Sequence, residues 1–252
     1  MFKEKKHIYF ASDFHFGTPT PEASLARELR VVEWMQSIRV SAAALYLVGD
    51  IFDYWYEYRS VVPKGYTHFF AELRRWRDMG IDVYFFTGNH DVWMYDYFPT
   101  EFGIPVYHEP IVREFDGRSF YIGHGDGLGD NDLGYRLLKG LFTNRLVQWC
   151  YTRLHPDLGA RIATFASRSS RAATGERDAE FLGNDREHLC CYSEMLLRTT
   201  PHDFFIFGHR HLPLDITLSD GKARYINLGD WLNHNTFAVW DGSTLLLERF
   251  DA

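Results

Sequence analysis

The sequence predicts an α/β fold in one domain, with two packed sheets and helices on the outside. Two patterns indicate this fold. Short apolar runs rich in β-branched and aromatic residues alternate with amphipathic helical segments, and closely spaced strands follow near the C-terminus. The 252 residues are 46% hydrophobic and 24% charged, which is enough to bury a core. This composition excludes a disordered chain, a collagen-like repeat and a coiled-coil rod.

Five of the apolar runs end at a small residue that precedes a polar side chain able to bind a metal. The runs are HIYFAS, ALYLVG, VYFFTG, FYIG and FFIFG. The polar residues after them are Asp13 and His15, then Asp50, then Asn89, His90 and Asp91, then His124, then His209 and His211. Continuous apolar runs suit strands that are buried on both faces. Because α/β sheets place their sites at the carboxyl ends of strands, we expect these side chains to gather.

Helical spacing of apolar residues predicts helices over residues 21–39 and 67–79, with Gly80 as a stop signal after the second. Near the C-terminus the pattern changes to four short strands, over residues 214–218, 223–228, 236–239 and 245–250. Asp220-Gly221 and Asp241-Gly242 supply the hairpin turns between them. These elements complete the predicted two-sheet architecture.

The candidate metal ligands suit a binuclear centre. They are Asp13, His15, Asp50, Asn89, His124, His209 and His211. Seven oxygen and nitrogen donors exceed what one tetrahedral zinc takes, and the absence of cysteine argues against thiolate-rich structural zinc. The mixed set favours two Mn²⁺ ions, with Fe²⁺ or Zn²⁺ as alternatives. We assign the bridging carboxylate to Asp50, since the other ligands then divide between two ions about 3.5–4 Å apart.

Such a centre hydrolyses phosphoesters. A water that bridges two cations loses a proton near neutral pH and becomes a nucleophile, while the cations offset the charge of the transition state. With Asn89 as a ligand, His90 lies just beyond the metal, where it could give a proton to the leaving oxygen with Asp91 orienting its ring. The alternative is that His90 only supports the ligands. A purely structural role for all five motifs is the wider alternative, but five such strand ends in order are not expected by chance.

These motifs, and GNHD and GHxH above all, resemble those of the calcineurin-like metallophosphoesterases. The resemblance covers the ligand positions from Asp13 to His211. It implies a four-layer αββα sandwich in a single domain over residues 1–252, with a helical cap insertion at about residues 128–200. In the family pattern one metal takes Asp13, His15, Asp50 and His211, and the other takes Asp50, Asn89, His124 and His209.

Within this superfamily the sequence is most similar to the pyrophosphohydrolases of UDP-2,3-diacylglucosamine, a UDP-linked acylated sugar of the lipid A pathway. The stretches SDFHFG, LVGDIFDYW, HGDGLGDNDLGYR and NLGDW carry this similarity. It implies Mn²⁺-dependent attack of hydroxide on the α-phosphate, with UMP and 2,3-diacylglucosamine 1-phosphate as products. It also implies substrate contacts, for which the candidates are Asn89, Tyr135, Arg168, Arg171 and His209. The subfamily usually has Arg where this chain has His90, the choice of the wider superfamily.

The segment over residues 136–171 is strongly basic inside an acidic protein. It holds seven basic residues and one acid, a charge of +6, whereas the whole chain carries −7. Apolar residues lie between the basic ones at helical spacing, which suits a lid that clasps an acylated anion or lies on a membrane surface. The alternative is an ordinary amphipathic helix pair packed on the core, with solvated arginines.

The net charge and the cysteine content limit the partners and the cellular location that we expect. The net charge of −7 argues against a non-specific nucleic-acid binder. Three cysteines and no secretory signal favour the cytoplasm, with peripheral contact at the inner face of the cytoplasmic membrane. No protein partner is implied. Two other functions compete: a soluble binuclear phosphodiesterase or phosphatase for nucleotides or other small phosphoesters, and a binding module without catalysis. The second predicts missing ligands, whereas all seven are present.

Overall fold

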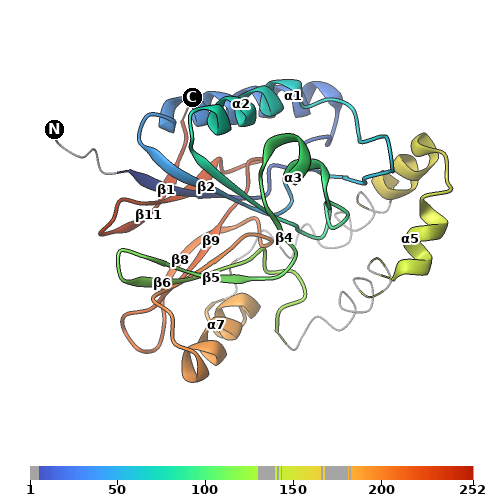
Figure 1. Cartoon of the computed structure of the whole chain (residues 1–252). Coiled ribbons are helices and arrows are strands. Elements are labelled where there is room, and N and C mark those ends of the chain that lie inside the picture. The colour runs from blue at the N-terminus through green and yellow to red at the C-terminus, as the bar shows by residue number, and fades with distance from the viewer. Residues whose placement is uncertain are drawn as a thin grey trace.

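Two sheets pack face to face and helices cover their outer sides. The computed structural model describes residues 6–129, 140, 142, 144–165, 167, 181 and 183–251. Helices α1 (Pro21–Ile38) and α2 (Thr67–Asp78) lie on one sheet, and α7 (His188–Thr199) lies on the other (Figure 1). The layers therefore follow the order helix, sheet, sheet, helix, which confirms the predicted αββα fold.

Within the described residues, the first sheet has six strands in the order β11-β10-β1-β2-β3-β4. They are β1 (His7–Ala11), β2 (Ala42–Val48), β3 (Asp82–Phe86), β4 (Val106–Tyr107), β10 (Thr236–Trp240) and β11 (Leu245–Arg249). Strands β1 to β4 are parallel, whereas β10 runs antiparallel to β1 and to β11. The carboxyl ends of β1, β2 and β3 therefore share one edge.

The second sheet, in the part of the chain that the structure describes, has five strands in the order β5-β6-β7-β9-β8. They are β5 (Ile111–Phe115), β6 (Arg118–Ile122), β7 (Phe204–Phe207), β8 (Pro213–Thr217) and β9 (Arg224–Leu228). Strands β6, β7 and β9 are parallel. The two predicted C-terminal hairpins are confirmed, but they belong to different sheets, since β8 pairs with β9 and β10 pairs with β11.

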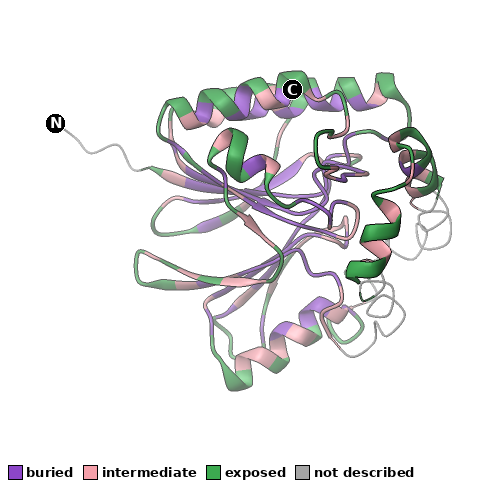
Figure 2. Ribbon diagram, turned by 45° about the vertical axis from the view of Figure 1, so that its right-hand side comes forward, coloured by how far each residue is buried: buried purple, intermediate pink, exposed green. Residues whose placement is uncertain are grey.

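The five strands that precede the candidate ligands are thus divided between the sheets. Strands β1, β2 and β3 belong to the first sheet, and β6 and β7 belong to the second. The loops after them meet at one end of the sandwich, where the chain is largely buried (Figure 2). One direct link is the ring of His124, whose Nδ1 donates to the carbonyl of Val48 at 2.9 Å. The site is therefore built across two sheets.

Aromatic side chains fill each interface of the sandwich. Between the sheets, Phe10 stacks on Tyr46 with 5.2 Å between ring centroids, and Ile206 and Ile226 pack with them. Below α1 and α2, Trp34 and many other rings form a second buried cluster. A third cluster lies between the second sheet and α7. The 17% aromatic content is therefore mostly core.

Helices α1 and α2 lie within a residue of their predicted bounds, and their ends have clear causes. Thr20 caps α1 by accepting from the amide of Ala23 at 3.2 Å, and Pro21 follows the cap. The first amides of α2 are satisfied by α1 instead, because buried Glu28 accepts from the amides of residues 68 and 69 at 2.9 and 3.1 Å. Gly80, with a φ of 75°, ends α2 as predicted.

The insertion also contains helices. Helix α5 (Arg145–Tyr151) and a further helix over residues 156–165 lie at the end of the sandwich where the ligand loops meet (Figure 1). Outside the insertion, a short helix, α3 (Tyr97–Phe102), follows β3. Among the residues described, none of the helices has the length and hydropathy needed to cross a bilayer. The cap boundaries at about residues 128–200 stay a prediction.

We expect Glu28→Ala to destabilise the protein by about 1–3 kcal/mol, because two amides at the start of α2, one of them buried, lose their acceptor. Urea unfolding followed by circular dichroism measures this change. The matched control is Glu33→Ala on the exposed face of α1, which should change the free energy of unfolding by less than about 0.5 kcal/mol. Equal effects of the two substitutions would contradict this role of Glu28.

Candidate metal centre

The structure brings all seven predicted ligands together at the end of the sandwich. We call Asp13, His15, Asp50 and His211 the first ligand group, and Asp50, Asn89, His124 and His209 the second. One ligand atom from each member of the first group lies within 4.8 Å of those of the others. Segments up to about 200 residues apart in the chain therefore converge, as the strand-end pattern predicted.

The first ligand group surrounds the carboxylate of Asp13. Its Oδ1 lies 3.6 Å from Nε2 of His15 and 3.2 Å from Nε2 of His211, and the two Nε2 atoms are 3.1 Å apart. Nε2 of His15 also lies 3.7 Å from Oδ2 of Asp50. Four donor atoms thus point at a common centre.

The second ligand group surrounds the other side of the Asp50 carboxylate. Nε2 of His124 lies 3.4 Å from Oδ2 of Asp50 and 3.4 Å from Oδ1 of Asn89. Nδ1 of His209 lies 3.0 Å from the same oxygen of Asn89. Since Nδ1 of His124 donates to a backbone carbonyl, its Nε2 is the ligating nitrogen. Oδ2 of Asp50 therefore faces both groups, the place required of a bridging ligand.

These residues fit divalent cations. Oδ1 of Asp13 is buried and has no hydrogen-bond partner within the described chain, although two imidazole nitrogens face it. A buried carboxylate oxygen without a hydrogen bond is costly unless a cation or proton compensates it. The donor set of carboxylate, amide and imidazole groups is one that Mn²⁺, Fe²⁺ and Zn²⁺ accept.

Five of the candidate ligands have a left-handed backbone conformation. The φ angles are 56° for Asp13, 46° for His15, 52° for Asp50, 69° for His209 and 55° for His211. Few residues other than glycine adopt positive φ, and such residues concentrate at functional sites, where the surrounding structure must hold them. These turns aim the side chains back across the strand ends, so the loop shapes are part of the site.

Two glycines are required by close approach to the ligands. A Cβ atom on Gly88 would lie 2.7 Å from Nε2 of His124, and one on Gly208 would lie 2.5 Å from Oδ2 of Asp13. Neither distance is possible for a carbon atom, so a side chain at either position would displace a ligand. This explains why these strands end in glycine.

The ligand charges depend on one another. Burial lowers the pKa of His124, but Asp50 outweighs it and raises that pKa to about 10. His211 behaves alike, since Asp13 overcomes burial and raises its pKa to about 10. Burial, aided by His124, lowers the pKa of His209 to about 3. Burial alone would raise the pKa of Asp50, yet the histidines hold it well below its ordinary value. In the cation-free protein, protons on His124 and His211 therefore supply the positive charge that compensates the buried carboxylates.

His90 lies beside the first ligand group, and Asp53 holds its ring. Nδ1 of His90 donates to the backbone carbonyl of Asp53 at 3.2 Å and lies 3.6 Å from its carboxylate. Oγ of Ser167 is 3.3 Å from the same nitrogen and 3.2 Å from Oδ2 of Asp53. The ring centroids of His90 and His15 are 4.9 Å apart. The ring of His90 is therefore held by Asp53 and Ser167 on one side and lies beside the ligand His15 on the other.

The expected role of Asp91 is wrong. Its carboxylate does not orient the ring of His90, because both oxygens accept from backbone amides: Gly88 at 2.7 Å, Ile51 at 2.9 Å and Phe52 at 3.3 Å. Burial and the nearby Asp50 raise the pKa of Asp91 to about 7. Asp91 therefore joins the loops that carry the ligands, and Asp53 takes the orienting position. The signal for Asp53 was its place in the same GDIFD stretch as Asp50.

Other polar residues contact the ligands and fix their orientation. The buried carboxylate of Asp230 lies 3.5 Å from Nδ1 of His211 and accepts from Nδ1 of His234 at 3.0 Å. Such a carboxylate fixes the orientation of a metal-bound imidazole and increases its basicity. On the opposite side, buried Arg27 donates to the carbonyl of His15 at 2.6 Å. Only Asp230 had a sequence signal, the NLGDW stretch.

Of the predicted substrate contacts, Asn89 and His209 lie in the second ligand group. Tyr135, Arg168 and Arg171 lie outside the described residues. Ser167, which opens the basic stretch that led to Arg168, is described and reaches His90 and Asp53. The insertion therefore touches the site at one point at least.

Aromatic contacts hold α5 against the ligand loops. The hydroxyl of Tyr56 donates to the carbonyl of Gln148 at 3.2 Å, and Nε1 of Trp93 donates to the carbonyl of Phe142 at 2.9 Å. The ring of Tyr151 lies 4.6 Å from that of Tyr56 and 4.9 Å from that of Trp93. Because Tyr56 and Trp93 follow β2 and β3, α5 is held against the loops that carry Asp50 and Asn89.

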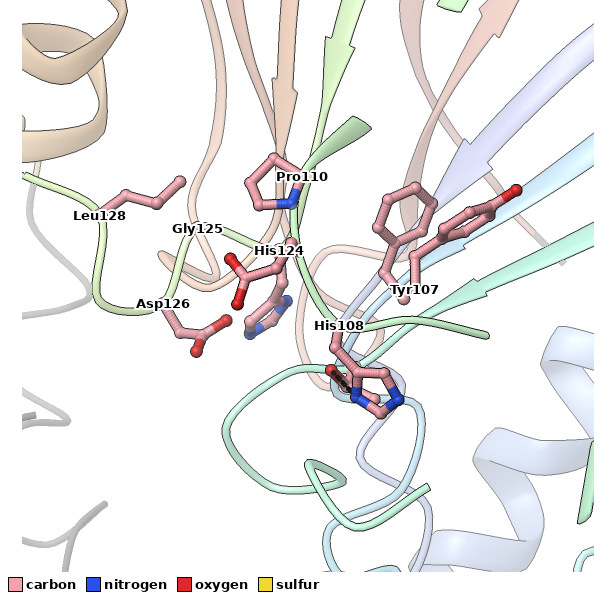
Figure 3. A pocket seen from close by; sticks show the side chains of 10 residues that line it. Tyr107, His108, Pro110, His124, Gly125, Asp126 and Leu128 are labelled. Atoms are coloured by element: carbon pink, nitrogen blue, oxygen red, sulfur yellow. Dashed lines mark hydrogen bonds between the residues drawn. The ribbon is translucent and has the colours of Figure 1, made fainter. Parts of the chain in front are cut away.

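A small pocket opens beside the second ligand group (Figure 3). His124 and Asp126 line one side, and Thr87, Tyr107 and His108 line the other. The pocket is small and has room for water-sized molecules. The pocket therefore does not define a substrate subsite by itself.

We expect the apparent affinity for Mn²⁺ to rise as the pH rises from about 6 to 9, because a cation must displace protons from imidazoles of raised pKa. At a pH below their pKa of about 10, His124 and His211 hold protons in the cation-free protein, so cation binding releases these protons. Calorimetric titrations in buffers of different ionisation enthalpy count the protons. His68→Ala, on the exposed side of α2, is the control and should not change this count. An affinity that does not depend on pH would contradict the account.

Comparison with known proteins agrees with this geometry. Residues 6–213 match the family described as calcineurin-like phosphoesterase. The chain is 38% identical to the UDP-2,3-diacylglucosamine hydrolase of Porphyromonas gingivalis, over 98% of both chains. It is 28% identical to the protein of the same name from Aeromonas salmonicida, over 95% of this chain and 92% of that one. The chain therefore belongs to the calcineurin-like phosphoesterase family and is a metal-dependent hydrolase.

Proposed function

We propose that this enzyme hydrolyses the pyrophosphate bond of UDP-2,3-diacylglucosamine and releases UMP and 2,3-diacylglucosamine 1-phosphate in lipid A biosynthesis. The observation that carries the proposal is the pair of ligand groups that share Asp50, since two-metal centres of this kind hydrolyse phosphoester bonds. The substrate is supported by the printed names of the relatives, one of them 38% identical over nearly the whole chain.

We assign the first ligand group to one cation and the second to the other, with Asp50 shared. Mn²⁺ is our preferred ion for this donor set, and Fe²⁺ or Zn²⁺ are the alternatives. When bound, two such cations supply a deprotonated water for attack on the α-phosphate and offset the charge of the phosphoryl group. The contribution of the chain is to hold the donors in place, which the left-handed turns and the glycines at 88 and 208 accomplish.

His90 is our candidate for the group that assists departure of the leaving phosphate. Its Nδ1 is held by the carbonyl of Asp53 and by Ser167, so a proton on Nε2 can reach the bridging oxygen. The carboxylate of Asp53, 3.6 Å from the ring, favours the charged imidazolium that such a donor requires. Asn89, at the start of the same turn, completes the second ligand group.

We propose that the insertion at about residues 128–200 is a cap that binds the acylated end of the substrate. The helices at residues 145–151 and 156–165 expose several large apolar side chains: Leu146, Trp149, Leu158, Ile162 and Phe165. The guanidinium of Arg153 lies 3.5 Å from the ring centroid of Trp149, so cationic and apolar groups share this surface. Exposed apolar patches mark binding surfaces. Tyr135, Arg168 and Arg171 remain our candidates for contacts with the sugar and phosphates.

The same exposed surface of the two helices supports a location at a membrane. An apolar face with arginines suits peripheral contact with anionic lipid, where an acylated substrate is found. We propose that the enzyme is cytoplasmic and works at the inner face of the cytoplasmic membrane. Its partner there is the UDP-linked acylated sugar, without nucleic acid or a protein partner.

The test of the function is a direct assay of purified protein with Mn²⁺ and UDP-2,3-diacylglucosamine, scored for UMP. We expect UMP release by the native enzyme, and a loss of at least about 10³-fold for Asp50→Ala, because both ligand groups lose their shared carboxylate. His68→Ala is the matched control and should keep native turnover. Hydrolysis of a small phosphodiester without UMP release would instead favour a phosphodiesterase for small phosphoesters.

His90→Ala should slow phosphodiesters with a poor leaving group by about 10²–10⁴-fold, because such a leaving oxygen needs a proton. Diesters with a 4-nitrophenyl leaving group should lose much less, since that oxygen leaves without one. Comparison of kcat for phenyl and 4-nitrophenyl diesters measures the difference, and Asp53→Asn should show the same trend more weakly. Equal losses for both substrates would remove His90 from the leaving-group role.

A further inference from the structure

We propose that a buried ion pair between Glu187 and Arg210 positions the loop over residues 209–211 for metal binding before the cation arrives. Arg210 lies between His209 and His211, one from each ligand group. Glu187 immediately precedes α7. The inference rests on the metal centre of the proposed function, to which it adds two positioning residues.

The pair is fully formed and shielded from water. Nε of Arg210 lies 3.1 and 3.0 Å from the two carboxylate oxygens of Glu187. The side chains are 10% and 1% exposed, respectively. The hydroxyl of Tyr225, on β9, donates to the same carboxylate at 3.4 Å. A buried charge pair of this kind fixes its partners strongly, because moving either one leaves an uncompensated charge in the core.

Two backbone hydrogen bonds hold the start of the loop: the amide of Arg210 donates to the carbonyl of Gly208 at 2.8 Å, and that of His209 donates to Oδ2 of Asp13 at 3.1 Å. A side-chain anchor is needed in addition because of the backbone conformation at the two histidines. His209 and His211 both have positive φ, and Arg210 lies between them. Two left-handed residues so close together persist only where surrounding contacts determine the conformation. Anchoring the intervening Arg210 side chain in the protein interior turns both imidazoles outward to their ligand groups. The arginine therefore acts through the two histidines and not on the substrate.

Helix α7 is a rigid support for the glutamate. The carbonyl of Glu187 accepts the first helical hydrogen bond, from the amide of Cys191 at 2.9 Å. Leu189 is completely buried in the cluster below the second sheet. The same leucine approaches so closely to Gly125, next to His124, that a Cβ atom there would lie 2.8 Å from its Cδ1. One helix thus supports the loops of both His124 and His209.

The consequence is a division of roles. The seven ligands contact the cations, whereas the ion pair sets where two of the ligands lie. Loss of the pair should therefore weaken cation binding in both groups while the donors themselves remain. A purely structural ion pair would instead change the stability of the cation-free protein and leave the affinity of the folded fraction intact.

The test measures the dissociation constant of Mn²⁺ by calorimetry for Glu187→Gln, Arg210→Met and the double variant, with circular dichroism to establish folding. We expect each single substitution to raise the dissociation constants by about 10–100-fold, as for other residues that orient metal ligands. The double variant should lose no more than the worse single one, because the two residues act as a unit. Turnover should recover at saturating Mn²⁺.

Asp215→Asn is the matched control, since Asp215 pairs with Arg224 in the same sheet without touching a ligand loop. It should bind Mn²⁺ as the native protein does. Native affinity for Mn²⁺ in folded Glu187→Gln would overturn the inference and leave the proposed function intact. Because Glu187→Gln keeps the shape of the side chain, it tests the inference even if Arg210→Met does not fold. Native protein that binds no divalent cation would overturn both.

Discussion

The carboxylate of Asp50 is the group on which the rest of the site depends. Its Oδ2 lies 3.7 Å from Nε2 of His15 and 3.4 Å from Nε2 of His124, and its Oδ1 accepts from the amide of His90 at 2.9 Å. His15 follows a strand of one sheet and His124 a strand of the other, so this side chain joins the two halves of the sandwich. A buried charge is tolerated only with compensating partners. In the cation-free protein, protonated imidazoles supply the positive charge that compensates Asp50. Bound cations would supply it once these protons are released.

Local sequence pattern predicted much of this site because its ligands all occupy the same structural position. Each follows a buried strand, and parallel strands bring their carboxyl ends to a common edge. The apolar spacing of α1 and the glycine after α2 are likewise local signals, so those helices lie within a residue of their expected bounds. The shared role of Asp50 also followed from counting donors, and its place between the ligand groups agrees with that role.

What the sequence did not predict depends on contacts between distant segments. Neither the strand pattern nor the turns showed that β6 and β7 belong to a different sheet from β1, β2 and β3. Asp91 was misread because adjacency to His90 suggested contact, whereas the turn directs its carboxylate to backbone amides. The pair of Glu187 and Arg210 spans 23 residues and has no motif, since any buried arginine looks like a surface one in sequence. The tertiary packing of the chain determines which residues form such pairs, and the local sequence pattern does not show them.

Diffraction from Mn²⁺-loaded crystals at the manganese absorption edge tests the central claim most directly. The account predicts two anomalous peaks about 3.5–4 Å apart. Asp50 should ligate both ions, with His15 and His211 on one and His124 and His209 on the other. A single peak, or two peaks that do not share Asp50, would contradict the binuclear centre proposed for this chain.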